Sequence, residues 1–267
     1  MGLNRHTDKN WLLPTIAQIP SIAVVFFLLG HSLTYTQQLD NYDTRSRLVD
    51  SAISGNLDEV KSLVRRGVWV DTHHDFKNIR PLYGAALNGH LKVVKYLVRR
   101  GAQIDFLESS NCDTPLTAAT RMGHLKVAKY LIQRGANFNM GGKIGTCHLT
   151  TPVTLASLHG HLEIVKLLLE KGVDTNKESG PFNFLPAQAA AIAGHTEVLK
   201  LLLDSDSKQV TLSNQSGLSL LQASEISENF ETIRFLLNKG ENLRGLEEIP
   251  DERLPSSINL RNIEKEI

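Results

Sequence analysis

The sequence contains little cysteine and carries almost no net charge. Two cysteines occur in 267 residues, which is too few for the disulfide-dense scaffold of a small secreted domain. The sequence leaves open whether Cys112 and Cys147 pair. A formal net charge of +1 argues against a protein built mainly around polyanion binding, so nucleic acid is not an expected partner.

Recognisable catalytic arrangements are also lacking. No Ser/His/Asp, Cys/His or paired-carboxylate pattern stands out. The glycine-rich segment GGKIG at 141–145 is not followed by the Gly-Lys-Ser/Thr of a phosphate-binding loop. The residues that could ligate zinc are irregularly spaced, namely His73, His74, Cys112, Cys147 and His148. We therefore expect no enzymatic activity, no cofactor and no bound metal.

Charge is absent from one long N-terminal stretch, because no charged residue lies between Lys9 and Asp40. Residues 12–33 contain the apolar run SIAVVFFLLG, and about 20 predominantly apolar residues suffice to cross a membrane as a helix. Three interpretations of residues 1–33 remain open: a retained single-span anchor, a cleaved signal peptide, and a hydrophobic helix packed on the folded domain. Residues 34–44 would then form a linker.

Basic residues flank this stretch asymmetrically. Arg5 and Lys9 precede it, and no Lys or Arg follows it until Arg45. This pattern favours a cytosolic N-terminus with the rest of the chain exported. We expect a single-pass membrane protein in this orientation. The alternative is a secreted or periplasmic protein that signal peptidase releases.

An internal repeat dominates the rest of the chain. The dipeptide Gly-His occurs at 89–90, 123–124, 160–161 and 194–195, at spacings of 34, 37 and 34 residues. Similar segments begin at each histidine: HLKVVKYL, HLKVAKYL, HLEIVKLL and HTEVLKLL. A second set precedes each dipeptide: RPLYGAA, TPLTAAT, TPVTLAS and LPAQAAA. Such a period indicates stacked structural repeats, and the longer spacing predicts an enlarged hairpin within 140–151.

Each unit predicts two helices. In TPLTAATRMG, Thr114 can cap the first helix, Pro115 occupies its first turn, and Gly123 tolerates a positive φ at its end. The second helix carries apolar side chains on one stripe, with Lys126 and Lys129 on the opposite side. Because a single helical hairpin cannot bury this stripe, the units should stack into a solenoid whose lysines face water.

These motifs resemble the ankyrin repeats, whose pattern contains T-P-L-H-x-A and a following Gly-His. The resemblance covers residues 45–240, about six repeats of which the first and last are degenerate. Residues 241–267 follow as a polar, acidic tail. The resemblance implies an all-α ankyrin-repeat solenoid of stacked helix-turn-helix units with hairpin-like loops. It also implies that the repeated histidines tie neighbouring loops together by hydrogen bonds: His90, His124, His161 and His195.

The resemblance further implies that the chain binds another protein, through its hairpin tips and the concave face of its first helices. The tip residues are Phe76, Lys77, Ile79, Asn111, Asp113, Phe182 and Phe184. The residues at the ends of the first helices are Leu87, Asn88, Arg121, Met122, Leu158, His159 and Ile192. We expect a monomeric interaction module that residues 12–33 hold at a membrane, or else a regulatory subunit or inhibitor of a separate enzyme.

Overall fold

The computed structural model describes residues 43–74, 79–108, 112–144, 147–205, 219–226 and 229–238. Two compact units comprise residues 1–44 and 45–267, and nearly all of the described residues belong to the second. The expected membrane segment 12–33, the acidic tail 241–267 and residues 34–42 of the expected linker lie outside the described residues. The last two residues of that linker, Asp43 and Thr44, are helical. Within the described ranges, no helix has the length and apolar character that a membrane crossing requires.

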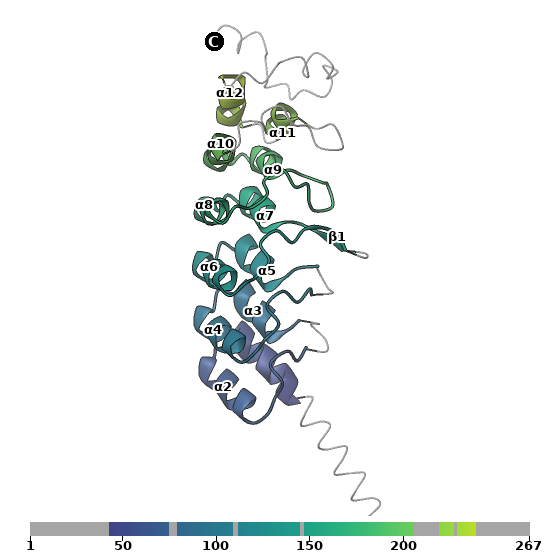
Figure 1. Cartoon of the computed structure of the whole chain (residues 1–267), viewed down its shortest axis with the longest axis vertical. Coiled ribbons are helices and arrows are strands. Elements are labelled where there is room, and N and C mark those ends of the chain that lie inside the picture. Colours follow the sequence, from purple (N-terminus) through teal and green to yellow (C-terminus); the bar gives the residue numbers. More distant parts are fainter. Residues whose placement is uncertain are drawn as a thin grey trace, which may run out of the picture. The chain divides into compact units, whose positions relative to one another are not determined.

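The described part of the chain consists of helix pairs joined by loops (Figure 1). Residues 43–53 are helical and pair with α2 (Leu57–Arg65) to form repeat 1. Repeats 2 to 6 are α3 (Pro81–Leu87) with α4 (Leu91–Arg99), α5 (Pro115–Arg121) with α6 (Leu125–Gln133), α7 (Pro152–Leu158) with α8 (Leu162–Glu170), α9 (Pro186–Ile192) with α10 (Thr196–Ser205), and α11 (Leu220–Ile226) with α12 (Phe230–Asn238). The expected solenoid of helical hairpins is confirmed.

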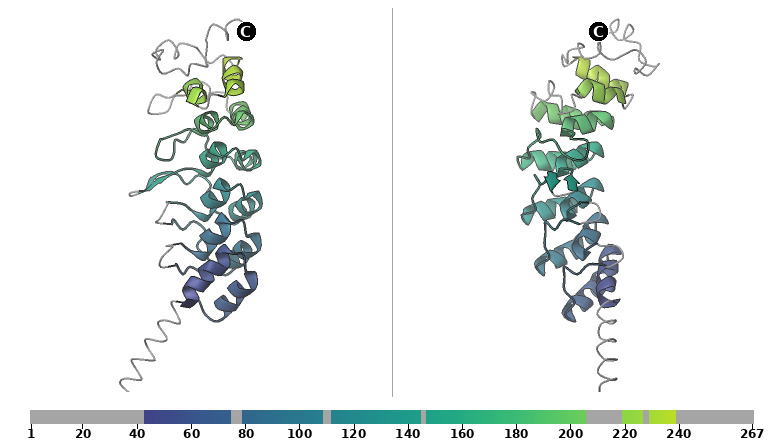
Figure 2. Two further views of the ribbon diagram at one scale, coloured as in Figure 1. Left: turned by 180° about the vertical axis from the view of Figure 1, so that it is seen from behind. Right: turned by 90° about the vertical axis from the view of Figure 1, so that its right-hand side faces the viewer.

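The strands within the described residues form one hairpin. Strand β1 (Gly142–Ile144) pairs antiparallel with β2 (Cys147–Leu149), with Gly142 opposite Leu149. This hairpin lies between α6 and α7, within the segment where the sequence carries its extra length. The expected enlarged hairpin is therefore confirmed. It leaves the stack on the same side as the other long loops, next to the first helices (Figures 1 and 2).

Local capping explains where the first helices begin. Proline occupies the first helical position of α3, α5, α7 and α9, where its missing N–H costs no hydrogen bond. Before α5, the N–H of Thr117 donates to Oγ1 of Thr114 at 3.2 Å, and the N–H of Thr114 donates to Oγ1 of Thr117 at 2.7 Å. This reciprocal pair satisfies two otherwise unpaired N–H groups.

Burial of the same position in every second helix holds the stack together. First helices pack on first helices of the next repeat, and second helices on second helices. Small residues such as Ala118 and Ala119, both fully buried, permit this close approach. The leucine at the seventh position of each second helix is 0% exposed: Leu63, Leu97, Leu131, Leu168, Leu202 and Leu236. Such burial is the main stabilising contribution in a repeat protein.

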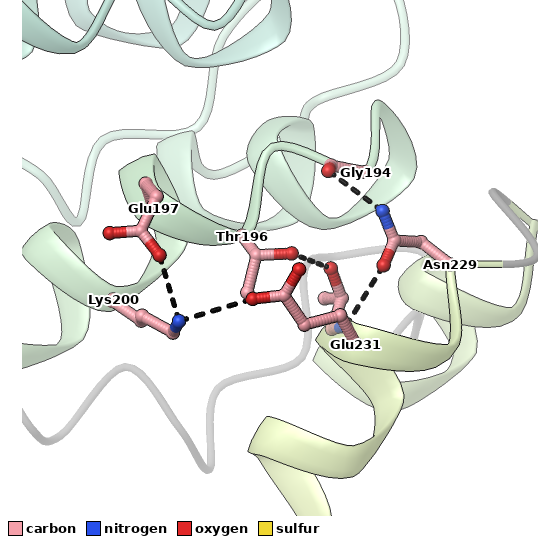
Figure 3. Close-up of polar contacts among 7 residues, drawn as sticks. Gly194, Thr196, Glu197, Lys200, Asn229 and Glu231 are labelled. Atoms are coloured by element: carbon pink, nitrogen blue, oxygen red, sulfur yellow. Dashed lines mark hydrogen bonds and ion pairs between the residues drawn. The ribbon is translucent and has the colours of Figure 1, made fainter.

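The repeated histidines join each repeat to the one before it. The Nε2 atom of His90 lies 2.8 Å from the carbonyl oxygen of Ile53, and the Nε2 of His124 lies 3.0 Å from that of Leu87. The structural role expected for these histidines is confirmed by such contacts. In the last repeat asparagine takes this place, and Nδ2 of Asn229 donates to the carbonyl oxygen of Gly194 at 2.9 Å (Figure 3).

Candidate interaction surface

The ends of the first helices form a row through consecutive repeats. Asn88 follows α3, Met122 follows α5 and His159 follows α7, and all three are exposed, Met122 at 52%. Asn88 also donates from Nδ2 to the carbonyl oxygen of Gly84 at 2.9 Å, so part of its polarity is satisfied within its own helix. The half-buried members of the row are Leu87, Arg121, Leu158 and Ile192. All seven residues expected at helix ends thus occupy equivalent places at the ends of first helices in consecutive repeats.

Two phenylalanines mark the loop between α8 and α9. Phe182 is 67% exposed, whereas Phe184 is half-buried. Their rings stack with centroids 5.5 Å apart at 25°. The backbone of Phe184 is paired in both directions with Ser179, at 3.1 and 3.2 Å. Phe184 therefore fixes the loop and supports Phe182, which presents an apolar ring to solvent.

Other expected tip residues are placed differently. Ile79 is half-buried, and its carbonyl oxygen accepts from the N–H of His74 at 3.0 Å. Phe76, Lys77 and Asn111 lie outside the described residues. Among the expected tip residues that the structure describes, only Phe182 is exposed.

Asp113 is buried, whereas the sequence placed it at an exposed tip. It is 5% exposed, forms an ion pair with Arg121, and accepts from Oγ1 of Thr117 at 3.3 Å. Burial raises the pKa of the Asp113 carboxyl, while the charge of Arg121 and the hydrogen bonds lower it. Because Arg121 folds back over the start of its own helix, neither charge is fully available to a partner.

The sequence interpretation missed an aromatic group near the start of the stack. Trp69 is 61% exposed, and the guanidinium carbon of Arg80 lies 5.9 Å from its ring centroid and 3.2 Å from that of Phe106. The backbone N–H of Arg80 donates to a carboxylate oxygen of Glu108 at 3.0 Å. Comparing repeats could have revealed Trp69, since the equivalent residues are polar: Gln103, Asn137 and Asp174.

The His159 ring at the middle of the row favours its neutral form. Its centroid lies 6.1 Å from that of His161, with 28° between the planes. Partial burial lowers the pKa of His159, and the positive charges of His161, Arg121 and His195 lower it further. Near neutral pH this side chain thus presents a neutral ring that can accept a hydrogen bond.

Two further features of the described residues concern metal ligands and cysteine. No group of three or more His, Cys, Asp or Glu among them is arranged to hold a metal ion. Cys112, which precedes the buried Asp113, is disulfide-bonded, and the chain has one other cysteine, Cys147. The ends of the first helices and the loop before α9 carry two exposed apolar side chains, Met122 and Phe182. Exposed polar residues, Asn88 and His159, lie in the repeats next to Met122.

Comparison with known proteins identifies the class. A family model described as ankyrin repeats in three copies matches residues 48–142, 106–179 and 153–245, which together cover most of the chain. The chain therefore belongs to the ankyrin repeat family, whose repeats are protein–protein interaction modules. No curated protein sequence gives a significant match.

Solved structures agree with this assignment. The crystal structure of the human ASB11 ankyrin repeat domain is similar, with a TM-score of 0.65 and 26% sequence identity, over 74% of this chain and 85% of that one. As many as 541 solved chains match in total, so the fold is widespread and names no particular partner.

Proposed function

We propose that this chain is a non-catalytic interaction module, held at a membrane by its N-terminal segment, that binds another protein through its loops and first-helix ends. The observation that carries the proposal is the exposure of large apolar side chains on this surface. Phe182 is 67% and Met122 52% exposed. Exposed aromatic and methionine side chains are the residues on which binding energy concentrates in protein interfaces.

The surroundings of these side chains support the same conclusion. Asn88 and His159 lie in the repeats on either side of Met122 and are exposed polar groups. An apolar centre with polar neighbours is the usual composition of a protein-binding surface. The stacked support from Phe184 reduces the ordering cost that Phe182 would incur on binding.

Membrane attachment is supported by the sequence of residues 12–33, and export of the repeats by two observations. Arg5 and Lys9 precede the apolar stretch, whereas no basic residue follows it until Arg45. The disulfide at Cys112 is a bond that persists in oxidising compartments. Mass spectrometry of the mature N-terminus distinguishes an anchor, which retains residue 1, from a released protein that begins after the apolar stretch.

The binding surface is tested by changing Phe182 and Met122 to Ser and quantifying cross-linked partners by mass spectrometry. Loss of a central anchor costs about 2 kcal/mol or more, roughly a 30-fold drop in affinity. Phe230→Ser is the matched control, because Phe230 is 53% exposed but lies on the second helix α12. Equal recovery with the double variant and the control would remove the surface assignment.

A further inference from the structure

The repeats differ at one position of their second helices. In repeats 1, 4 and 5 the second residue of the second helix is acidic, and it pairs with a lysine three residues later. These pairs are Asp58–Lys61 at 3.6 Å, Glu163–Lys166 at 2.7 Å and Glu197–Lys200 at 2.8 Å. In repeats 2 and 3 the same position is a lysine, Lys92 on α4 and Lys126 on α6. In repeats 2 and 3, therefore, the lysine three residues later has a second lysine where the other repeats have its carboxylate partner.

This exchange produces a continuous basic face on α4 and α6, which are neighbours in the stack. Neither helix contains an acidic residue. Six of the seven basic side chains are exposed and the other is half-buried. Among the described residues, none of the seven is ion-paired with a carboxylate. The basic face comprises Lys92, Lys95, Arg99, Arg100, Lys126, Lys129 and Arg134.

Two tyrosines lie beneath these cations. The Nζ of Lys95 is 5.7 Å from the ring of Tyr130, the Cζ of Arg134 is 5.2 Å from the same ring, and the Cζ of Arg100 is 5.3 Å from that of Tyr96. Tyr130 is only 8% exposed. The rings therefore hold the cations by cation–π contacts and are not free to stack on nucleic acid bases.

We propose that the basic face binds an anionic lipid surface through the phosphate groups of its headgroups. The cations come from equivalent places on two adjacent helices, so they spread over a face and do not converge on a single ligand. A cluster of four to eight basic residues close to a membrane is the usual basis of such binding, and each contributes about a fivefold gain in partitioning. The proposal rests on the membrane proximity proposed above but not on the export proposed there, because the anionic surface potential is that of the cytoplasmic leaflet.

The test uses the full chain and flotation with two kinds of vesicle, phosphatidylcholine alone and phosphatidylcholine with about a third phosphatidylserine. The variant is Lys92→Glu with Lys126→Glu, which installs the acidic residue that repeats 4 and 5 already carry. The matched control is Lys171→Glu with Arg234→Glu. It makes the same charge change at two exposed positions outside the basic face.

We expect the wild-type chain and the control to prefer the phosphatidylserine vesicles, and the variant to lose at least about 25-fold of that preference. Salt at about 1 M should abolish the preference of the wild type, because it shortens the screening length to about 3 Å. This salt measurement needs no variant and stands even if the variant folds poorly. Binding to phosphatidylcholine alone reports on residues 12–33, so failure of the membrane tether is distinguished from failure of the basic face.

Three results would overturn the proposal. One is an equal preference for phosphatidylserine in the variant and the control. Another is a salt-independent preference in the wild type. The third is that the variant keeps vesicle binding but loses binding to single-stranded RNA or to polyglutamate, which would assign the basic face to a nucleic acid or an acidic protein segment.

Discussion

The imidazole ring of His161 lies against Gly123 of the preceding repeat. A Cβ atom built on this glycine would lie 2.6 Å from Cε1 of the ring, closer than atoms can approach without displacement. The Nε2 of His161 is also 2.9 Å from the carbonyl oxygen of Arg121. One histidine thus meets two requirements at once, a hydrogen bond and a close fit.

Gly123→Ala should be more destabilising than an equivalent change without this neighbour. Gly123 has φ +74°, and Gly135 has φ +92° with no atom within 4 Å of the place where a Cβ would lie. Either alanine carries a backbone cost of about 1–2 kcal/mol, but only the first also displaces His161. We expect Gly123→Ala to lower the free energy of unfolding by at least about 1 kcal/mol more than Gly135→Ala. Urea unfolding followed by circular dichroism measures both, and equal losses would contradict the fit.

The buried hydroxyls of Thr196 and Thr232 should show strong coupling. Their Oγ1 atoms are 2.7 Å apart, and the residues are 5% and 0% exposed. Thr196→Val leaves Thr232 without this partner and should cost about 1–3 kcal/mol, whereas changing both to Val should be close to neutral. A double-mutant cycle in urea provides the measurement. Additive losses in the double variant would show that the two hydroxyls act independently.

Glu225→Gln should raise stability at neutral pH and leave it unchanged in acid. Burial raises the pKa of the Glu225 carboxyl, so the unfolded chain releases this proton at lower pH than the folded one. The contribution of Glu225 to stability is therefore fully present below the unfolded pKa and is lost as the pH rises through the folded pKa. Unfolding free energies at pH 7 and about pH 3 test this. A variant less stable than the wild type at pH 7 would mean that the charge is stabilised by its surroundings.

The disulfide at Cys112 predicts that the native protein resists alkylation before reduction. Iodoacetamide should add no label to the untreated chain and two labels after reduction, since the sequence has two cysteines. Reduction should also lower the free energy of unfolding by about 2–4 kcal/mol. Intact-mass spectrometry reads the labels directly, and two labels on the unreduced native protein would contradict the bond.

The repeat pattern was enough to predict the helix pairs and the enlarged hairpin, because both depend on spacing and residue type within one unit. The hydrogen-bonding role of the histidines was implied by the resemblance to the ankyrin repeats. The exchange of histidine for Asn229 was visible as a break in the pattern. The consequence of this exchange could not be predicted, because Asn229 makes two different hydrogen bonds. Its Nδ2 donates to the carbonyl oxygen of Gly194, and its Oδ1 caps α12 by accepting from the N–H of Thr232 at 3.0 Å.

The burial of Asp113 could not be predicted in the same way. Its position beside the loop indicated exposure, and the outcome depends on the direction that the long Arg121 side chain takes. The cation–π contacts of Arg80 with Trp69 and Phe106 likewise depend on rotamers and on the distance between two repeats. Residue periodicity sets which face a side chain occupies, but it does not determine which neighbour a long side chain reaches. The residues proposed to bind a partner stay predictions that only a binding experiment decides.

The contact of His161 with Gly123 also bears on how such a chain can evolve. After a tandem duplication of one internal unit, the histidine of the new unit would contact the glycine of the unit before it. The glycine of the new unit would contact the histidine of the unit after it. The array can therefore grow or shrink by whole units in a single genetic event. The last unit would resist being copied into the interior, because Glu228 stands where the other units have the glycine that receives the next histidine.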